Sequence, residues 1–411
     1  ASYFQQMARV DPPFAHAYRR ALDPANLTGN KHFWRTDFQV HRRPAHFFTL
    51  KMCSKRVVGA ESCNSENVLG YYMGDGATFL YQSGREYEDI FPFWDWKKIP
   101  GTTTHQNPAP LRVLTCSGYR LDSDFVGGVS DGRSGMAAMD YRRDGLSARK
   151  SWFFFDDLLV CLGTGIKSGE GHPVTTSIDQ TLFAGQALAH ADGEQALGSG
   201  NWAWKNPKWV LHGQTGYYFP AGGEVRLETQ PVSGSWHRVA TRYPDEQIEA
   251  PVFKLWMEHG ENPAAQTYAY AVVPHASAAS LRKLARKQPF RLLSNEKHMQ
   301  AVVSASGSLA GIAFYEAGKA EVFGGIAVDQ PCLLLLNKSK IGLRISVSDP
   351  TQKLARIQLR VNGQVAATGG GGAGNVVFDG TESMVTIVLP TGREAGKTVS
   401  LDLAHLTKQK K

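Results

Sequence analysis

The sequence has few cysteines and no long apolar run. Its five cysteines include no Cys-x-x-Cys pair, so zinc-ribbon and thioredoxin-type sites are excluded. We interpret them as scattered core thiols, and a single disulfide between Cys53 and Cys63 stays open for an exported protein. No run of about eighteen apolar residues occurs, which predicts no transmembrane helix. The start, Ala1-Ser2-Tyr3, lacks the basic-then-apolar pattern of a signal peptide, so we expect that any export signal was removed or was never present.

Blocks of like charge are also absent. The 411 residues contain 45 Lys and Arg against 37 Asp and Glu, a formal net charge of +8. A hydrophobic share of 42% with 20% charged residues is typical of globular proteins and excludes a disordered chain. The length fits two or three domains. The positive balance suits a polyanionic partner, but because it is dispersed it indicates general attraction and no defined site.

Helical periodicity is confined to residues 1–21, where Pro12-Pro13 interrupts it, and to residues 277–286. Patterns typical of strands, rich in aromatic and β-branched residues, occupy 47–52, 152–155, 158–162, 209–212 and 268–273. After residue 289 the strands shorten, at 332–336, 343–347 and 357–361, with a hairpin-like turn at Asn362-Gly363. The sequence therefore predicts a mainly β fold, in which a helical stub precedes a large antiparallel β-domain and a smaller β-sandwich.

Two short motifs match catalytic patterns without their context. Residues 128–132 (GVSDG) match the nucleophile elbow of serine hydrolases, but no helix pattern follows them, so we interpret the segment as a turn. Residues 258–261 (EHGE) could supply metal ligands, but no partner ligands lie at metal-site spacing, which favours a loop between strands.

The segment Trp94-Asp95-Trp96-Lys97-Lys98 is denser in aromatic residues than a solvent loop needs. Indole faces can stack on sugar rings, and the neighbouring lysines could meet acidic substituents. The alternative is that both tryptophans pack in the core, and their alternation makes this expected for at least one of them.

A polar cluster occupies residues 61–67 (ESCNSEN), between a strand and the pair Tyr71-Tyr72. An Asn amide can hydrogen-bond a substrate carboxylate, and a nearby Glu can hold that amide or a basic partner in place. By itself the cluster is only a polar turn. We take it as the candidate site.

Six blocks in order carry a family resemblance: 41–44 (HRRP), 52–56 (MCSKR), 61–76 (ESCNSENVLGYYMGDG), 94–103 (WDWKKIPGTT), 151–163 (SWFFFDDLLVCLG) and 268–277 (YAYAVVPHAS). In these blocks the chain resembles polysaccharide lyase family 8, the chondroitin, hyaluronan and xanthan lyases. The resemblance implies a helical toroid, a β-supersandwich and a small β-domain. It predicts here a stub of the toroid at 1–28, the β-supersandwich at 29–288 and the C-terminal β-sandwich at 289–411.

Family members cleave next to a uronic acid by β-elimination. The resemblance implies that Asn64 and Glu61 are the catalytic residues contributed by the β-domain. We expect substrate contacts from Arg42, Arg43 and Asn67, and from the two tryptophans, Trp94 and Trp96. The His, Tyr and Arg residues that move protons in the family belong to its helical domain, and no residue of this chain matches them.

The resemblance also carries expectations about cofactor, partner and location. No cofactor is required. Some family members bind calcium beside the Trp-rich loop, but Lys97 stands where a second acid would follow Asp95, which argues against a metal. The expected partner is an acidic polysaccharide, chondroitin sulfate or hyaluronan, and neither nucleic acid nor membrane. A helical domain on the same or another chain would complete a bacterial enzyme that is secreted or periplasmic. The alternatives are a non-catalytic polyanion-binding module and a lyase for xanthan or another acidic polysaccharide.

Overall fold

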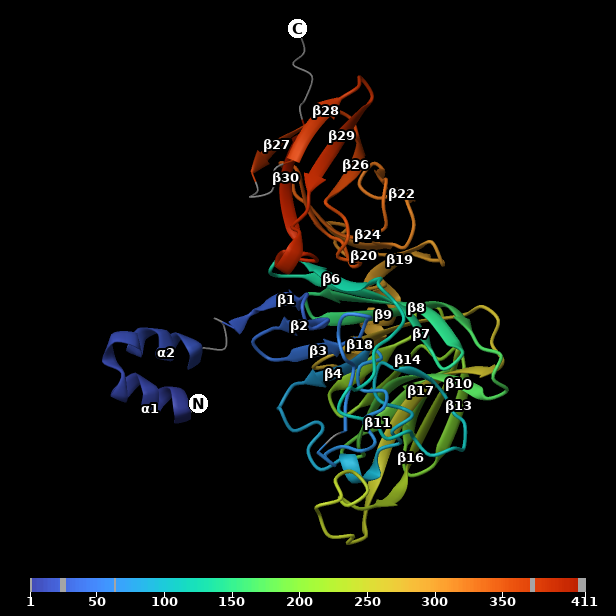
Figure 1. Ribbon diagram of the computed structural model, residues 1–411. Helices are drawn as coiled ribbons and strands as arrows, with labels where there is room; N and C mark the ends of the chain where they lie inside the picture. Colours follow the sequence, from blue (N-terminus) through green and yellow to red (C-terminus); the bar gives the residue numbers. More distant parts are fainter. Residues whose placement is uncertain (1, 23–26, 63, 370–373, 406–411) are drawn as a thin grey trace.

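The computed structural model describes residues 2–22, 27–62, 64–369 and 374–405. The chain begins with two helices, α1 (Ser2–Val10) and α2 (Ala15–Leu22), which contact each other and lie beside the β-domains in Figure 1. The short 3-10 turn η1 (Pro12–Phe14) separates them, because a proline ring cannot continue a helix through its interior. The predicted helical stub is therefore present.

Three antiparallel sheets make up residues 29–273. The first has the order β1 (Gly29–Phe33), β2 (Phe38–Arg42), β3 (Phe47–Lys51), β4 (Ala77–Tyr81). The second has the order β13 (Asn201–Lys205), β16 (Glu224–Gly234), β17 (Ile248–Glu261), β10 (Pro173–Leu182), β5 (Thr103–His105). The third has the order β12 (Glu194–Leu197), β11 (Ala187–His190), β14 (Trp209–His212), β15 (Thr215–Tyr218), β18 (Gln266–Val273), β9 (Leu158–Lys167), β8 (Leu146–Phe155), β7 (Gly135–Arg143), β6 (Val126–Ser130).

A helix, α3 (Ala278–Lys287), leads to the C-terminal part of the chain. Ser277 caps it, since its side chain accepts the Ser280 backbone N–H. One C-terminal sheet has the order β19 (Phe290–Asn295), β20 (Met299–Ser304), β21 (Leu309–Phe314), β24 (Cys332–Lys338), β25 (Leu343–Ser348), β30 (Val399–His405), β27 (Val365–Gly369). The other has the order β22 (Gly318–Ala320), β23 (Ile326–Val328), β26 (Arg356–Asn362), β29 (Glu382–Val388), β28 (Gly374–Phe378).

The mainly β prediction is confirmed, and one turn is corrected. The chain does turn at Gly363, whose φ of 81° suits glycine. However, β26 pairs with β23 and β29, whereas β27 pairs with β30 in the other sheet. The turn at Asn362-Gly363 therefore crosses between the two sheets of the sandwich and is no hairpin.

Apolar cores lie between the sheets. One large cluster fills the central β-domain, and a second fills the C-terminal sandwich. A third cluster joins the two, since Phe153 and Leu162 of the central domain share it with Leu333 and Leu335. Figure 1 shows the C-terminal strands standing directly above the sheet that contains β6 to β9. Within the described ranges, no helix has the length and apolar character needed to cross a membrane.

Candidate functional site

The polar cluster forms an exposed loop within the long connection from β3 to β4. The chain leaves the first sheet at Lys51 and returns at Ala77, opposite it. We call residues 61–70 the site loop. Glu61 and Asn64 are both exposed in it, which is the position that a substrate contact requires. Cys63 lies outside the described residues, and its possible partner Cys53 is a buried free thiol.

The conformation of the site loop is defined by its own bonds. Ser65 and Asn67 have φ values of 57° and 51°, the left-handed region in which Asn is tolerated better than most residues. The Ser62 hydroxyl donates to the Asn67 carbonyl at 3.3 Å. The Asn67 side chain is half-buried, and its Oδ1 accepts no hydrogen bond from the described residues. Asn67 therefore shapes the loop, and its predicted substrate contact stays a prediction.

The site loop is attached to the connection between β16 and β17. Glu66 forms an ion pair with Arg242 at 2.5 Å, and the Val68 backbone N–H donates to the Val239 carbonyl at 2.9 Å. These contacts join two segments that are far apart in the sequence. The loop is thus exposed at its tip and held from the side.

Trp94 and Trp96 are buried, so most of their ring surface is not free for a sugar. Their side chains are 1% and 4% exposed. The Trp94 ring stacks on Phe79 with centroids 6.1 Å apart, and its Nε1 donates to the Gln180 carbonyl at 3.1 Å. The two indoles also meet edge to face, at 5.2 Å. Both indoles therefore pack in the core, as the alternative expected. They also line a cavity of about 480 Å³, so their predicted contact with a sugar stays a prediction.

Arg43 is also internal, in contrast to Arg42. Arg43 is 7% exposed, donates to the Arg133 carbonyl at 3.0 Å and lies 3.6 Å from the Asp156 carboxylate. These contacts give it a structural role. Because Arg43 also lines the cavity described next for Arg42, its predicted substrate contact stays a prediction. Arg42 is half-buried, packs over the Phe47 ring and lines a cavity of about 590 Å³.

The structure does not bring Arg42 next to Asn64. Arg42 pairs with Phe47, and Phe47 pairs with Tyr81. The connection that contains the site loop departs from the opposite end of these strands, at Lys51. Of the predicted contact residues, Glu61, Asn64 and Asn67 therefore lie together, and Arg42 belongs to another part of the surface.

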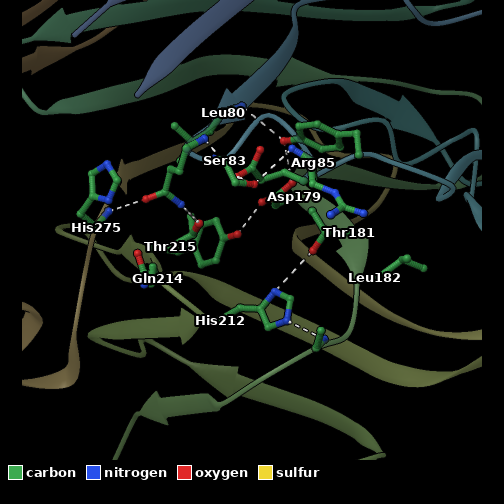
Figure 2. Close-up of a pocket in the computed structure, with 16 residues that line it drawn as sticks. Leu80, Ser83, Arg85, Asp179, Thr181, Leu182, His212, Gln214, Thr215 and His275 are labelled. Atoms are coloured by element: carbon green, nitrogen blue, oxygen red, sulfur yellow. Dashed lines mark hydrogen bonds between the residues drawn. The ribbon is translucent and has the colours of Figure 1, made fainter. Parts of the chain in front are cut away.

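Sequence reasoning missed a cavity of about 510 Å³ that Figure 2 shows around Asp179 and His212. The Asp179 carboxylate accepts the hydroxyl groups of Tyr87 and Tyr217, and burial raises its pKa from 3.8 to about 6. The only sequence signal was a single carboxylate in the Thr-rich run of β10. His212 lies between the rings of Phe183 and Phe253, and burial lowers its pKa to about 4.

The residues beside the Trp-rich segment do not fit a calcium ion. The Lys97 ammonium donates to the Asn107 carbonyl at 2.5 Å, to Asn107 Oδ1 at 3.0 Å and to the Ala109 carbonyl at 2.5 Å. Asp95 forms an ion pair with Lys98 at 2.9 Å. The oxygen atoms of Asn107 and Ala109 that could bind a calcium ion therefore already bind the Lys97 ammonium. Over the described ranges, no three His, Cys, Asp or Glu side chains cluster as metal ligands.

Comparison with known proteins identifies the family. The sequence profile described as polysaccharide lyase family 8, super-sandwich domain, matches residues 28–285, and that of the C-terminal β-sandwich domain matches residues 291–358. Chondroitinase-AC of Pedobacter heparinus is 36% identical over 349 residues, which are 84% of this chain and 49% of that protein. Xanthan lyase of Bacillus sp. is 32% identical over 338 residues, 78% of this chain and 36% of that protein.

Solved structures agree with the fold. A chondroitinase AC lyase, described in complexes with oligosaccharides, superimposes with a TM-score of 0.87 at 32% identity and covers 97% of this chain and 59% of its own. The Streptomyces coelicolor chondroitin AC lyase in complex with chondroitin sulphate gives 0.80 at 28% identity, over 92% and 50%. The chain spans about half the length of the curated relatives that it matches. On the profile match and these identities, the chain belongs to polysaccharide lyase family 8.

Proposed function

We propose that this chain forms the β-domain side of the substrate cleft of a lyase for uronic-acid-containing glycosaminoglycans, of the chondroitin sulfate type. The observation that carries the proposal is the exposed, anchored site loop with Glu61 and Asn64, in a chain 36% identical to a chondroitinase AC. The formal net charge of +8 is consistent with a sulfated, anionic substrate.

In the proposed reaction, the bond between the uronate C4 and the leaving oxygen breaks by β-elimination. Neutralising the uronate carboxylate makes the C5 proton acidic, a base removes that proton, and an acid protonates the leaving oxygen. The Asn64 amide would donate to the carboxylate, and the donation gains strength as negative charge builds toward the enolate-like intermediate. Glu61 would hold the amide or a basic partner in place.

We propose that the proton-moving groups lie outside these 411 residues. The local candidates near the β-domain surface are poorly suited. His105 is 4% exposed, bonds the Ser168 hydroxyl at 2.7 Å, and has its pKa lowered by burial. Tyr72 is 5% exposed, and burial raises the pKa of its hydroxyl well above its ordinary value of 10.0. A helical domain on the same or another chain would supply base and acid.

The rival functions are a binding module that holds a polyanion without cleaving it, and a lyase for xanthan. The identity to a xanthan lyase, 32%, keeps the second in view. We further propose a secreted or periplasmic enzyme that needs no cofactor. A chelator should then leave its activity unchanged.

The test compares chondroitin sulfate, hyaluronan and xanthan as substrates and as immobilised ligands. Absorbance of the unsaturated uronate product should stay flat with the 411-residue chain alone and rise with the complete enzyme on chondroitin sulfate. The chain should be retained on a chondroitin sulfate column, and less so as salt rises through the physiological range. Product formed by the chain alone would overturn the proposal that the proton-moving groups lie outside these 411 residues. If the column does not retain the chain, the proposed substrate is wrong.

A further inference from the structure

Arg143 lies under the site loop, buried at the end of β7. Its side chain is 1% exposed. The guanidinium carbon lies 3.7 Å from the centroid of the Tyr71 ring and 3.6 Å from that of Tyr119. The two rings are 6.0 Å apart and tilted by 47° to each other, so one guanidinium packs against both. Such contacts are strongest where the cation is removed from water.

The two rings lie beside the two ends of the site loop. On the entering side, the Gly59 N–H donates to the Tyr119 carbonyl at 2.8 Å and the Tyr119 N–H to the Ala60 carbonyl at 3.1 Å. Ala60 directly precedes the loop. On the leaving side, Tyr71 follows Gly70 directly, and its hydroxyl donates to Asp144 at 3.1 Å. Arg143 therefore contacts the loop's exit directly and its entrance through Tyr119.

Arg143 is itself held by Asp75. Its Nη1 donates to both carboxylate oxygens, at 2.8 and 2.7 Å. Asp75 is fully buried and also accepts the Tyr141 hydroxyl at 3.2 Å. Nε and Nη2 of Arg143 make no hydrogen bond to the described residues, although Nε lies 3.7 Å from the Asp144 carboxylate. The guanidinium meets the two rings through its face. The ion pair holds the guanidinium in place, and the face is left for the rings.

We infer that Arg143 is a positioning residue, which fixes the separation of the two ends of the site loop through Tyr71 and Tyr119 and thereby orients Glu61 and Asn64. With a side chain that is 1% exposed, the guanidinium has almost no surface that a substrate could contact. Its use for catalysis rests on the proposed function of the loop, but its action on the loop does not. A flat cation meets two rings at once, which a compact ammonium does not do equally well.

The experiment uses Tyr119→Leu, with Tyr119→Phe as the matched control. Tyr119 is half-buried, so its truncation is tolerated better than a change at Arg143. Hydrogen exchange, followed by mass spectrometry, reports the amides of Gly59, Tyr119 and Val68. We expect about tenfold faster exchange in peptides covering residues 58–70 of Tyr119→Leu, and wild-type exchange in Tyr119→Phe, which keeps the ring. Peptides of β9 should be unchanged in both.

A second variant and a binding assay complete the test. Arg143→Lys keeps a cation beside Asp75 and loses the flat face, so it should also speed exchange at 58–70. Titration with a chondroitin sulfate hexasaccharide should show weaker binding for Tyr119→Leu and rescue by Tyr119→Phe. Wild-type exchange at 58–70 in Tyr119→Leu, or an equal rise in β9, would overturn the inference. If even the wild type fails to bind the sugar, the proposed function fails while the exchange data still decide the role of Arg143.

Discussion

The two β-domains of this chain bury different kinds of side chain. The C-terminal sandwich encloses a cluster of Val, Leu, Ile and Ala side chains, with Phe314 as its fully buried aromatic ring. The central domain buries tryptophans, tyrosines and histidines, together with charged groups such as Lys150, Asp75 and Arg143. All nine tryptophans of the sequence lie between residues 34 and 256.

The difference shows that hydrogen bonds and ion pairs are buried where the fold has to hold its loops in place. An aliphatic core holds two sheets together without specifying its loops. In the central domain, Lys150 donates to the carbonyls of Asp75 and Gly101, and thereby ties two loop segments to β8. Burial lowers the Lys150 pKa to about 7. Such interiors define loop conformation, but their stability depends on protonation.

Acid should unfold the central domain before the C-terminal sandwich, and this is the largest effect that we expect. Burial lowers the pKa of His32 to about 4 and those of His41 and His259 to about 3, all in the central domain. Since the unfolded chain takes up these protons near pH 6.5 and the folded one does not, stability is lost as pH falls from 6.5 toward 4. Each histidine contributes about 3 kcal/mol, on the order of 10 kcal/mol together. Asp179, with its pKa raised to about 6, offsets about 3 kcal/mol over the same range. Burial also raises the pKa values of Asp37 and Asp75, which offset a further part of the loss.

Tryptophan fluorescence mainly follows the central domain, because every tryptophan lies in it and only Trp34 among those described also bonds the C-terminal part, at the Arg393 carbonyl. Its emission should shift red in acid before the amides of β24 in the C-terminal sandwich lose protection from exchange. His259→Gln, which can still bond the Thr176 hydroxyl, should move the transition to lower pH. A single transition shared by both domains, or one unmoved by His259→Gln, would contradict the comparison.

Trp94→Ala should destabilise the central domain by about 3–5 kcal/mol, the range for truncating a buried aromatic ring. The ring is 1% exposed and stacks on Phe79, so its removal leaves a cavity. Urea unfolding followed by the remaining tryptophans measures the loss. Lys205→Met, an exposed change in β13, is the control and should cost less than about 0.5 kcal/mol. A folded Trp94→Ala protein of unchanged stability that no longer binds chondroitin sulfate would favour the sugar-stacking interpretation over the core one.

The sequence predicted helices and strands better than it predicted which side chains are buried. The run 209–212 is the strand β14 and the run 277–286 is α3 with its Ser277 cap, because periodicity and capping are local signals. Trp94 and Trp96 could not be placed by pattern, since an alternating aromatic pair suits a core and a sugar platform equally well. The family resemblance predicted a substrate contact for Arg43, and its burial was not foreseen because arginine is usually exposed. Its contacts, Arg133 and Asp156, lie about 90 residues or more away in the chain, beyond any local signal.

Asn64→Ala tests the exposed side of the comparison. In the complete lyase we expect turnover to fall about 10²–10³-fold, roughly 3–4 kcal/mol, with a smaller effect on substrate binding. Stability should change by less than about 0.5 kcal/mol, because the side chain is exposed. Steady-state rates with chondroitin sulfate and a urea titration provide both numbers. Normal turnover, or failure to fold, would make Asn64 a structural turn residue and leave the β-domain a passive wall of the cleft.

Lys97→Met should have the smallest effect of these substitutions. It removes a half-buried cation that holds a loop. The Lys97 ammonium bonds three oxygen atoms of Asn107 and Ala109, and so holds the segment after β5 against the Trp-rich segment. Because these oxygens can partly return to water, the loss should be about 1–2 kcal/mol. If the ammonium takes a metal's place, neither calcium nor a chelator will move the melting temperature of the wild type. Lys97→Asp, which restores a second acid beside Asp95, should instead be stabilised by calcium. A wild-type melting temperature that rises with calcium and falls with chelator would show that the Lys97 ammonium does not occupy the place of a metal ion. The Asp95 carboxylate would then have to leave Lys98 to bind calcium.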